Sequence, residues 1–285
     1  ESLAEYTYNS KGQVQTETSY NTNSYGDEVS TTKSYKYGWE ETTYVDMLNH
    51  NLLTAIIEEK VVVTNGNTST TTQCGVTTWR NDWMGNNSTA ACWAVGKAYV
   101  WDGTTASSDF EYGSYSGSSE PTTGWVKLKD IISRNSNGLE TESTDVDQSP
   151  STIIYDKNHH FSIAQFINAD ASQIYYTGFE SYEDLSALNI SSTPTNYDST
   201  QAKTGQRSLK FSMGNTLSLY LSPNTINQVY ILGVWVKNDG GTGYVDCYLQ
   251  EDSSQGVYNS LIINTRGVWK FQLFKIDFSA ANVTN

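Results

Sequence analysis

Short stretches in which aromatic or β-branched residues alternate with polar residues recur along the chain. The first runs from Glu1 to Glu17 and places Tyr6, Tyr8 and Val14 on either side of the polar segment Asn9–Gly12. An asparagine followed three residues later by a glycine is typical of a tight turn, because glycine adopts positive φ without steric cost. The pattern predicts a β-hairpin with its turn at Asn9–Gly12.

The same pattern returns at Ile132–Glu142, where Asn135 and Gly138 have the same spacing, and in weaker form at Ile154–Asn158. Tyr35 and Tyr37 form half of such a match. An isolated hairpin is marginally stable in water, so we expect these hairpins to stack on their neighbours in one sheet.

The stretch Leu52–Val63 is open to two interpretations. Its Leu-Leu-Ala-Ile-Ile spacing is compatible with a helix, but its isoleucines and valines are β-branched and favour a strand. A strand here would meet a hairpin turn at Asn65-Gly66 and return along Thr68–Thr72. Elsewhere we expect a polar loop at Asn21–Asp27 and a strand at Phe110–Tyr115.

Several segments occur in the order found in one protein family. They are Gly124–Lys127, Ser151–Tyr155, Ala164–Ala169 and Ile174–Glu180. With the hairpins, this series resembles bacterial proteins of the RHS/YD-repeat family, whose hairpins coil into a large spiral sheet. The resemblance implies that residues 1–177 form such a sheet. Residues 61–123 are either an inserted β subdomain or part of it.

A second resemblance begins at residue 178. Its marks are Phe179-Glu180, the segment Ala202–Leu209 containing Thr204-Gly205, Trp235-Val-Lys237, and Trp269 followed by Phe271. They resemble jelly-roll modules of the carbohydrate-binding and galactose-binding-like type. The predicted fold is therefore all-β, a YD-repeat hairpin sheet followed by a β-sandwich. The closing strand of such modules is missing before Asn285, so we expect residues 178–285 to be truncated at their C-terminal end.

Composition and charge narrow the function. The 36 aromatic residues (8 Trp, 20 Tyr and 8 Phe) favour β structure. With 31 acidic and 17 basic residues, the net charge is −14 and no cluster of Lys or Arg occurs, which argues against nucleic acid as a partner. Apolar runs such as Ile231–Val236 are far shorter than the ~20 residues that span a membrane. A chain that starts at Glu1 is expected to be a piece of a larger secreted or cell-surface bacterial polypeptide.

No arrangement typical of catalysis stands out. The adjacent carboxylates Glu40-Glu41 and Glu58-Glu59 would point to opposite faces of a strand, and neither a nucleophile elbow nor a phosphate-binding loop occurs. His159 and His160 are expected to be turn residues rather than metal ligands. We therefore predict that this chain is not an enzyme.

Candidate binding and bridging residues remain. Four tryptophans, Trp79, Trp83, Trp93 and Trp101, form either a sugar-stacking platform or part of a core. Cys74 and Cys92 are either a disulfide pair or two free thiols, and Cys247 is expected in a strand. The jelly-roll resemblance implies a structural calcium at Glu180, with no other cofactor. Carbohydrate would be bound by exposed tyrosines on strands, for which the candidates are Tyr220, Tyr244, Tyr248 and Tyr258.

These observations predict a structural segment that forms a shell or scaffold, with glycans as candidate partners of its second module. Two other functions remain open. One is an ancillary carbohydrate-binding region of a polysaccharide-degrading enzyme, and the other is a stalk domain of an adhesin. Further hairpins, a catalytic domain or tandem jelly rolls in neighbouring sequence would separate the three.

Overall fold

The chain is mostly β structure and divides into two compact units. In the computed structural model, the units are residues 1–174 and 175–285. The structure describes residues 3–83, 93–107, 110–112, 120–121, 123–183, 188–190, 197–211, 217–219, 229–240, 243–251 and 254–277, with backbone only for 188–190, 217–219, 243–251, 254–263 and 276–277.

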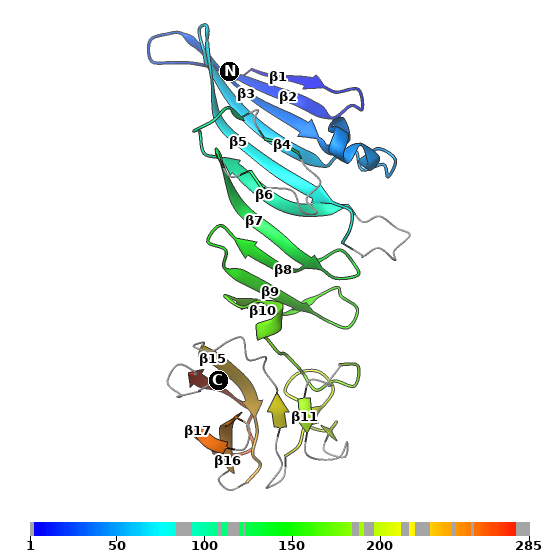
Figure 1. Cartoon of the computed structure of the whole chain (residues 1–285), viewed down its shortest axis with the longest axis vertical. Coiled ribbons are helices and arrows are strands. Elements are labelled where there is room, and N and C mark those ends of the chain that lie inside the picture. Colours follow the sequence, from blue (N-terminus) through cyan, green and yellow to red (C-terminus); the bar gives the residue numbers. More distant parts are fainter. Residues whose placement is uncertain are drawn as a thin grey trace. The chain divides into compact units, whose positions relative to one another are not determined.

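Unit 1 is built on one ten-stranded antiparallel sheet in which the strands follow one another in chain order (Figure 1). The strands are β1 (Ala4–Tyr8), β2 (Val14–Thr22), β3 (Glu28–Tyr37), β4 (Ile56–Asn65), β5 (Thr68–Arg80), β6 (Ala94–Trp101), β7 (Trp125–Arg134), β8 (Glu140–Asp145), β9 (Pro150–Tyr155) and β10 (Ser162–Ile167). The predicted large hairpin sheet is thus present. The described strands within residues 61–123, namely the end of β4 with β5 and β6, belong to this sheet.

Four hairpins of this sheet close with the same turn. An Asn or Asp donates its backbone N–H to the carbonyl of the fourth residue on, and its side-chain Oδ1 accepts the N–H groups of the second and fourth residues on. These residues are Asn9, Asn23, Asn135 and Asp145, and the side-chain bonds measure 2.9–3.1 Å. At Asp156 the turn is one residue longer. Asp156 donates its backbone N–H to the carbonyl of Phe161, and its Oδ1 accepts the N–H groups of His160 and Phe161.

The third residue after each Asn or Asp has a positive φ, as in a type I turn that ends in a bulge. Glycine occupies that place in three turns, at φ +80° in Gly12, +88° in Gly26 and +76° in Gly138, whereas Gln148 (+61°) and His159 (+57°) occupy it in the others. The turns predicted at Asn9–Gly12 and Asn135–Gly138 are confirmed. The polar loop expected at Asn21–Asp27 is present only over residues 23–27, because β2 continues to Thr22, and Asn23 and Gly26 form the same turn in it.

The connection between β4 and β5 is a different hairpin. Asn65 pairs with Thr68, so the loop consists of Gly66 (φ +57°) and Asn67. The hairpin predicted at Asn65-Gly66 is confirmed. The strand predicted over Leu52–Val63 is present only from Ile56 onward, since residues 52–55 lie outside any strand.

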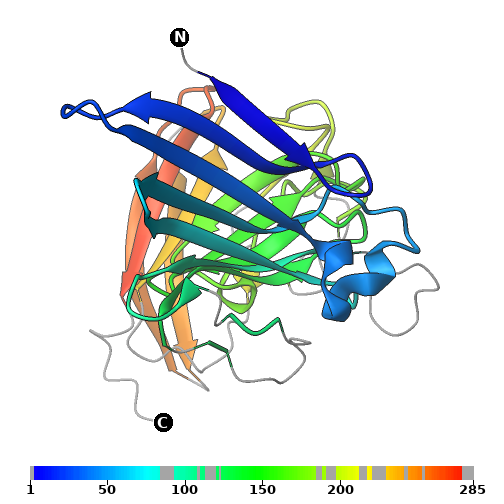
Figure 2. The same ribbon diagram turned by 90° about the horizontal axis from the view of Figure 1, so that it is seen from above.

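The core of unit 1 has two clusters. In the first, Tyr44 and Met47 of the 3₁₀ helix η2 (Thr42–Met47) pack with Ala55 and Ile57. This helix follows η1 (Gly38–Glu40), and Figure 2 shows the coiled segment at the end of β3. A Cβ on Gly38 would lie 2.3 Å from the Met47 sulfur, so only glycine lets the two segments approach this closely.

The second cluster joins Cys74 and Val76 of β5, Tyr99 of β6 and Trp125 of β7. Phe110 covers it, with its ring centroid 5.3 Å from that of Tyr99 and 4.9 Å from that of Trp125. Residues 110–112 form no strand, so the strand expected at Phe110–Tyr115 was wrong for the described residues. The rings of Phe110 and Tyr112 pack over the sheet, and residues 110–112 do not pair with it as a strand.

Unit 2 contains four antiparallel strand pairs in its described part. They are β11 (Leu188–Ile190) with β14 (Leu217–Leu219), β12 (Tyr197–Asp198) with β13 (Ser208–Leu209), β15 (Val229–Val236) with β18 (Lys270–Asp277), and β16 (Gly243–Glu251) with β17 (Ser254–Ile263). Among the described side chains of the β15/β18 pair, that of Phe274 is almost fully buried, with 1% of its surface exposed.

The shared turn yields the first prediction. Replacing Asn135 with alanine leaves the N–H groups of Asn137 and Leu139 without their side-chain acceptor, and we expect the free energy of unfolding to fall by about 1 kcal/mol, as for a lost helix cap. The control is Ser136→Ala, because Ser136 is exposed in the same turn. Urea denaturation measures both, and equal stability of the two variants would contradict the role of the asparagine side chain.

Candidate functional site

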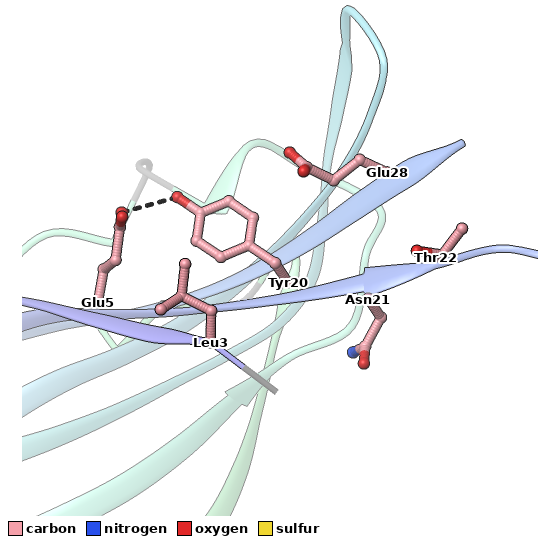
Figure 3. A pocket seen from close by; sticks show the side chains of 6 residues that line it. All are labelled: Leu3, Glu5, Tyr20, Asn21, Thr22 and Glu28. Carbon is pink, nitrogen blue, oxygen red and sulfur yellow. Dashed lines mark hydrogen bonds between the residues drawn. The ribbon is translucent and has the colours of Figure 1, made fainter. Parts of the chain in front are cut away.

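The first candidate is a hollow on the sheet beside the edge strand β1. It has a volume of about 520 Å³ and is lined by Leu3, Glu5, Tyr20, Asn21, Thr22 and Glu28. Figure 3 shows the side chains of Glu5, Tyr20 and Glu28 on one side of the sheet and that of Asn21 on the other. The hollow therefore presents an aromatic ring between two carboxylates.

Hydrogen bonding organises this group. The hydroxyl of Tyr20 donates to Oε2 of Glu5 over 2.8 Å. This bond, together with partial burial and the negative charges of Glu5 and Glu28, raises the pKa of Tyr20 above its ordinary value. No local sequence pattern marks the hollow, because its residues come from β2, β3 and the segment from Leu3 into β1, which meet only through the strand register.

The four tryptophans do not form a stacking platform in the structure. Trp79 and Trp93 pack against the first core cluster, and Trp101 packs against the second. The ring of Trp83 has the guanidinium groups of Arg80 and Arg134 at 4.3 and 5.2 Å from its centroid. Of the two interpretations, core packing fits the contacts of Trp79, Trp93 and Trp101.

Three carboxylates of the adjacent pairs Glu40-Glu41 and Glu58-Glu59 each bind another group of the protein. Glu41 forms a salt bridge of 2.6 Å with Lys36, and Glu58 accepts a hydrogen bond of 2.9 Å from the Tyr112 hydroxyl. Burial and the adjacent Glu58 charge raise the pKa of Tyr112. Glu40 accepts from the backbone N–H of Tyr37. These contacts give each of the three carboxylates a structural role.

Glu180 lies in a compact loop at the start of unit 2 and is buried. Its Oε1 accepts a hydrogen bond of 2.8 Å from the backbone N–H of Gln206. The adjoining Gly205 has φ +71°, and a Cβ there would lie 2.0 Å from the same oxygen. Glu183 accepts from the N–H groups of Gly178 (3.0 Å) and Glu180 (3.2 Å). The two segments marked by the jelly-roll resemblance, Phe179-Glu180 and Thr204-Gly205, therefore meet.

This loop does not by itself provide a calcium site. Calcium prefers six to eight oxygen ligands, whereas the carboxylates of Glu180 and Glu183 accept hydrogen bonds from backbone N–H groups. In the described part of the chain, no three residues among His, Cys, Asp and Glu gather to hold a metal. His159 lies in the turn that follows Asp156, where turn residues were expected. The calcium at Glu180 stays a prediction without support from these contacts.

The structure describes no side chain of the four tyrosines predicted to bind sugar. Tyr220 lies outside the described residues. Tyr244 and Tyr248 pair through the backbone with Ile262 and Val257 in β16 and β17, and Tyr258 adjoins the irregularity in this register. The side chains of these three tyrosines, and of Cys247 in β16, lie outside the described part of the structure.

An exposed aromatic pair does occur on the β15/β18 sheet. The centroids of Trp235 and Phe271 are 5.3 Å apart, and the two residues are directly opposite in the register. The Phe271 ring extends over Gly233, where a Cβ would lie 2.8 Å from Cζ. About half of each aromatic side chain is exposed, and Ile231 and Leu273 on the same face are exposed more fully. In the sequence, Trp235 and Phe271 were noted only as part of the resemblance to jelly-roll modules and not as binding residues.

Cys74 is buried and stands as a free thiol in the structure. Burial raises its pKa to about 11. Cys92 lies outside the described residues. The two alternatives for Cys74 and Cys92 that the sequence left open therefore stay open.

The contact between Glu180 and Gly205 yields the second prediction. Gly205→Ala places a Cβ against the buried carboxylate and forces alanine into positive φ, so we expect unit 2 to lose at least about 2 kcal/mol of stability. The control is Gly240→Ala, because a Cβ at Gly240 meets no atom within 4 Å. Thermal denaturation followed by tryptophan fluorescence measures both variants. Equal melting temperatures would show that the loop relaxes freely.

Comparison with known proteins adds no relative to these observations. No protein-family model, no curated protein and no solved structure matches the chain. Within the residues that the structure describes, helices of the length and apolar character needed to cross a membrane are absent. Any functional conclusion therefore depends on the geometry above.

Proposed function

We propose that unit 1 is a non-enzymatic scaffold, a segment of a larger secreted or cell-surface bacterial protein of the RHS/YD-repeat type. The observation that carries this proposal is the shared turn at Asn9, Asn23, Asn135 and Asp145, with a longer version at Asp156. One turn used repeatedly within a sheet of consecutive strands is what a repeat protein requires, because each unit must present the same edges to its neighbours.

Contacts between the repeats support this proposal. The side-chain amide of Asn137, in the turn between β7 and β8, donates to the backbone carbonyls of Asn158 (3.0 Å) and His159 (3.3 Å) in the turn between β9 and β10. Threonine hydroxyls also meet across strands, at 2.7 Å between Thr7 and Thr16 and at 3.0 Å between Thr18 and Thr32. Such contacts between neighbouring strands and turns stabilise an array without any central site.

A non-enzymatic role agrees with the contacts of the carboxylates. A glycosidase needs two carboxyl groups that converge on one bond. Glu41 and Glu58, however, contact Lys36 and Tyr112. The exposed pair in the hollow, Glu5 and Glu28, flanks a tyrosine whose hydroxyl already donates to Glu5.

Isolation of the native protein tests the scaffold proposal and its predicted location. An antibody raised against residues 1–174 should recover, from the medium or the cell surface, a polypeptide much larger than the 31.7 kDa of this sequence. Electron microscopy of that material should show a regular β-rich particle. Recovery of a small protein from the cytoplasm, or of a particle with polysaccharide-hydrolysing activity abolished by substitution of Glu41 or Glu58, would contradict the proposal.

A second function, glycan binding by unit 2, has one observation in its favour, namely the exposed pair of Trp235 and Phe271. Aromatic ring faces suit the apolar faces of sugars. The amino group of Lys203 lies over the Trp235 ring, 4.5 Å from its centroid, and adds a hydrogen-bond donor beside the pair. This pair takes the place of Tyr220, Tyr244, Tyr248 and Tyr258 as the best-described candidate. Glycan binding would also fit the ancillary-module and adhesin alternatives.

Glycan binding is tested by an array screen of the whole chain followed by calorimetry, with and without calcium. We expect Trp235→Ala and Phe271→Ala each to weaken binding by about tenfold, the scale of one lost aromatic contact. The control is Tyr182→Ala, because Tyr182 is an aromatic residue of unit 2 with a similar exposed fraction, 48%. Equal affinity in all three variants, each shown to be folded by circular dichroism, would remove the aromatic pair as the site and leave the scaffold proposal untouched.

A further inference from the structure

The sequence contains two Asn-Gly dipeptides, Asn65-Gly66 and Asn137-Gly138, and both lie at hairpin turns of unit 1. Asparagine is one of the thermally labile residues of proteins. A glycine after it favours modification, because glycine has no side chain to hinder its own backbone nitrogen. Both asparagines are exposed, so access of water does not distinguish the two sites. Their hydrogen bonds do.

Hydrogen bonds hold the reactive groups of Asn137-Gly138 in place. The side-chain Nδ2 of Asn137 donates to the backbone carbonyls of Asn158 (3.0 Å) and His159 (3.3 Å). The backbone N–H of Gly138 donates to the carbonyl of Asn135 over 2.9 Å. The Asn137 amide can meet the Gly138 nitrogen only after these bonds break, so the fold protects this asparagine.

Asn65-Gly66 lacks both kinds of bond. Within the residues that the structure describes, no hydrogen bond engages the side chain of Asn65, and the N–H of Gly66 has no backbone acceptor. A Cβ on Gly66 would meet no atom within 4 Å, so the space around the turn is open. Asn65 is the last residue of β4, where it pairs with Thr68 and Val29. Such strand ends open more readily than the middle of a sheet.

We propose that Asn65 is a site of non-enzymatic deamidation, whereas Asn137 is protected from the same reaction. The backbone nitrogen of Gly66 loses its proton and attacks Cγ of Asn65. The new C–N bond closes a succinimide ring, the bond from Cγ to Nδ2 breaks, and ammonia leaves with the proton. Water then opens the ring and leaves aspartate or isoaspartate, depending on which carbonyl it attacks. This site does not depend on the proposed scaffold function.

Either product changes the tip of the β4/β5 hairpin. The new carboxylate adds one negative charge to a chain whose net charge is already −14. Isoaspartate also directs the main chain through Cβ, which adds one backbone atom at the position that pairs with Thr68 and Val29. Pairing at this end of β3, β4 and β5 depends on an exact register, so the modification loosens the tip.

Incubation of the folded full chain in water labelled with heavy oxygen tests the proposal, because each opened ring takes up the label. Trypsin separates the two sites into the peptides 61–80 and 135–157. Mass spectrometry with electron-transfer fragmentation then measures the label and distinguishes isoaspartate from aspartate. We expect Asn65 to be modified at least about tenfold faster than Asn137, because the reaction at Asn137 must first break several hydrogen bonds.

Two controls separate the fold from the dipeptide. In the chain unfolded by urea, both asparagines should be modified at comparable rates. In the folded chain, Asn135→Ala should speed the reaction at Asn137, because it loosens that turn, and leave Asn65 unchanged. The proposal is overturned if the folded chain modifies both asparagines equally, if Asn65 takes up no label, if the unfolded chain keeps the same difference, or if Asn135→Ala leaves Asn137 as slow as before.

Discussion

The interaction on which unit 1 depends is the acceptance of two backbone N–H groups by a single Asn or Asp side chain at the head of a turn. A three-residue loop leaves these N–H groups without partners in the ladder, and the Oδ1 atom satisfies both at 2.9–3.1 Å. The same side chain fixes where one strand ends and the next begins. Register follows from this, because a shift by one residue would move every side chain to the other face of the sheet.

The turn explains how the sheet can be long with little core. Buried apolar residues are concentrated over β4–β7, where the 3₁₀ segment and residues 110–112 cover one face. Outside this region, neighbouring strands are joined by polar side-chain contacts, such as those between Thr7 and Thr16 or between Thr18 and Thr32. The ends of the sheet therefore depend more on turns and cross-strand pairs than on burial, as expected for arrays whose units contact only their neighbours.

How much the sequence could predict depended on how local each feature was. Asn9–Gly12, Asn135–Gly138 and Asn65-Gly66 were predictable because the turn residues lie within four positions of one another. Asn23–Gly26 has the same spacing and could have been found in the same way. The turn at Asp145 gave no such signal, because Gln148 adopts the positive φ that usually indicates glycine.

Features made by distant residues were not predictable in this way. Phe110 and Tyr112 alternate like a strand, yet they cover the core, and no local pattern distinguishes the two roles. The hollow joins residues of three strands, and the contact of Glu180 with Gly205 spans about 25 residues of sequence. The jelly-roll resemblance placed Glu180 and Gly205 in two separate segments. Only the fold shows that one carboxylate occupies the space that the glycine leaves free.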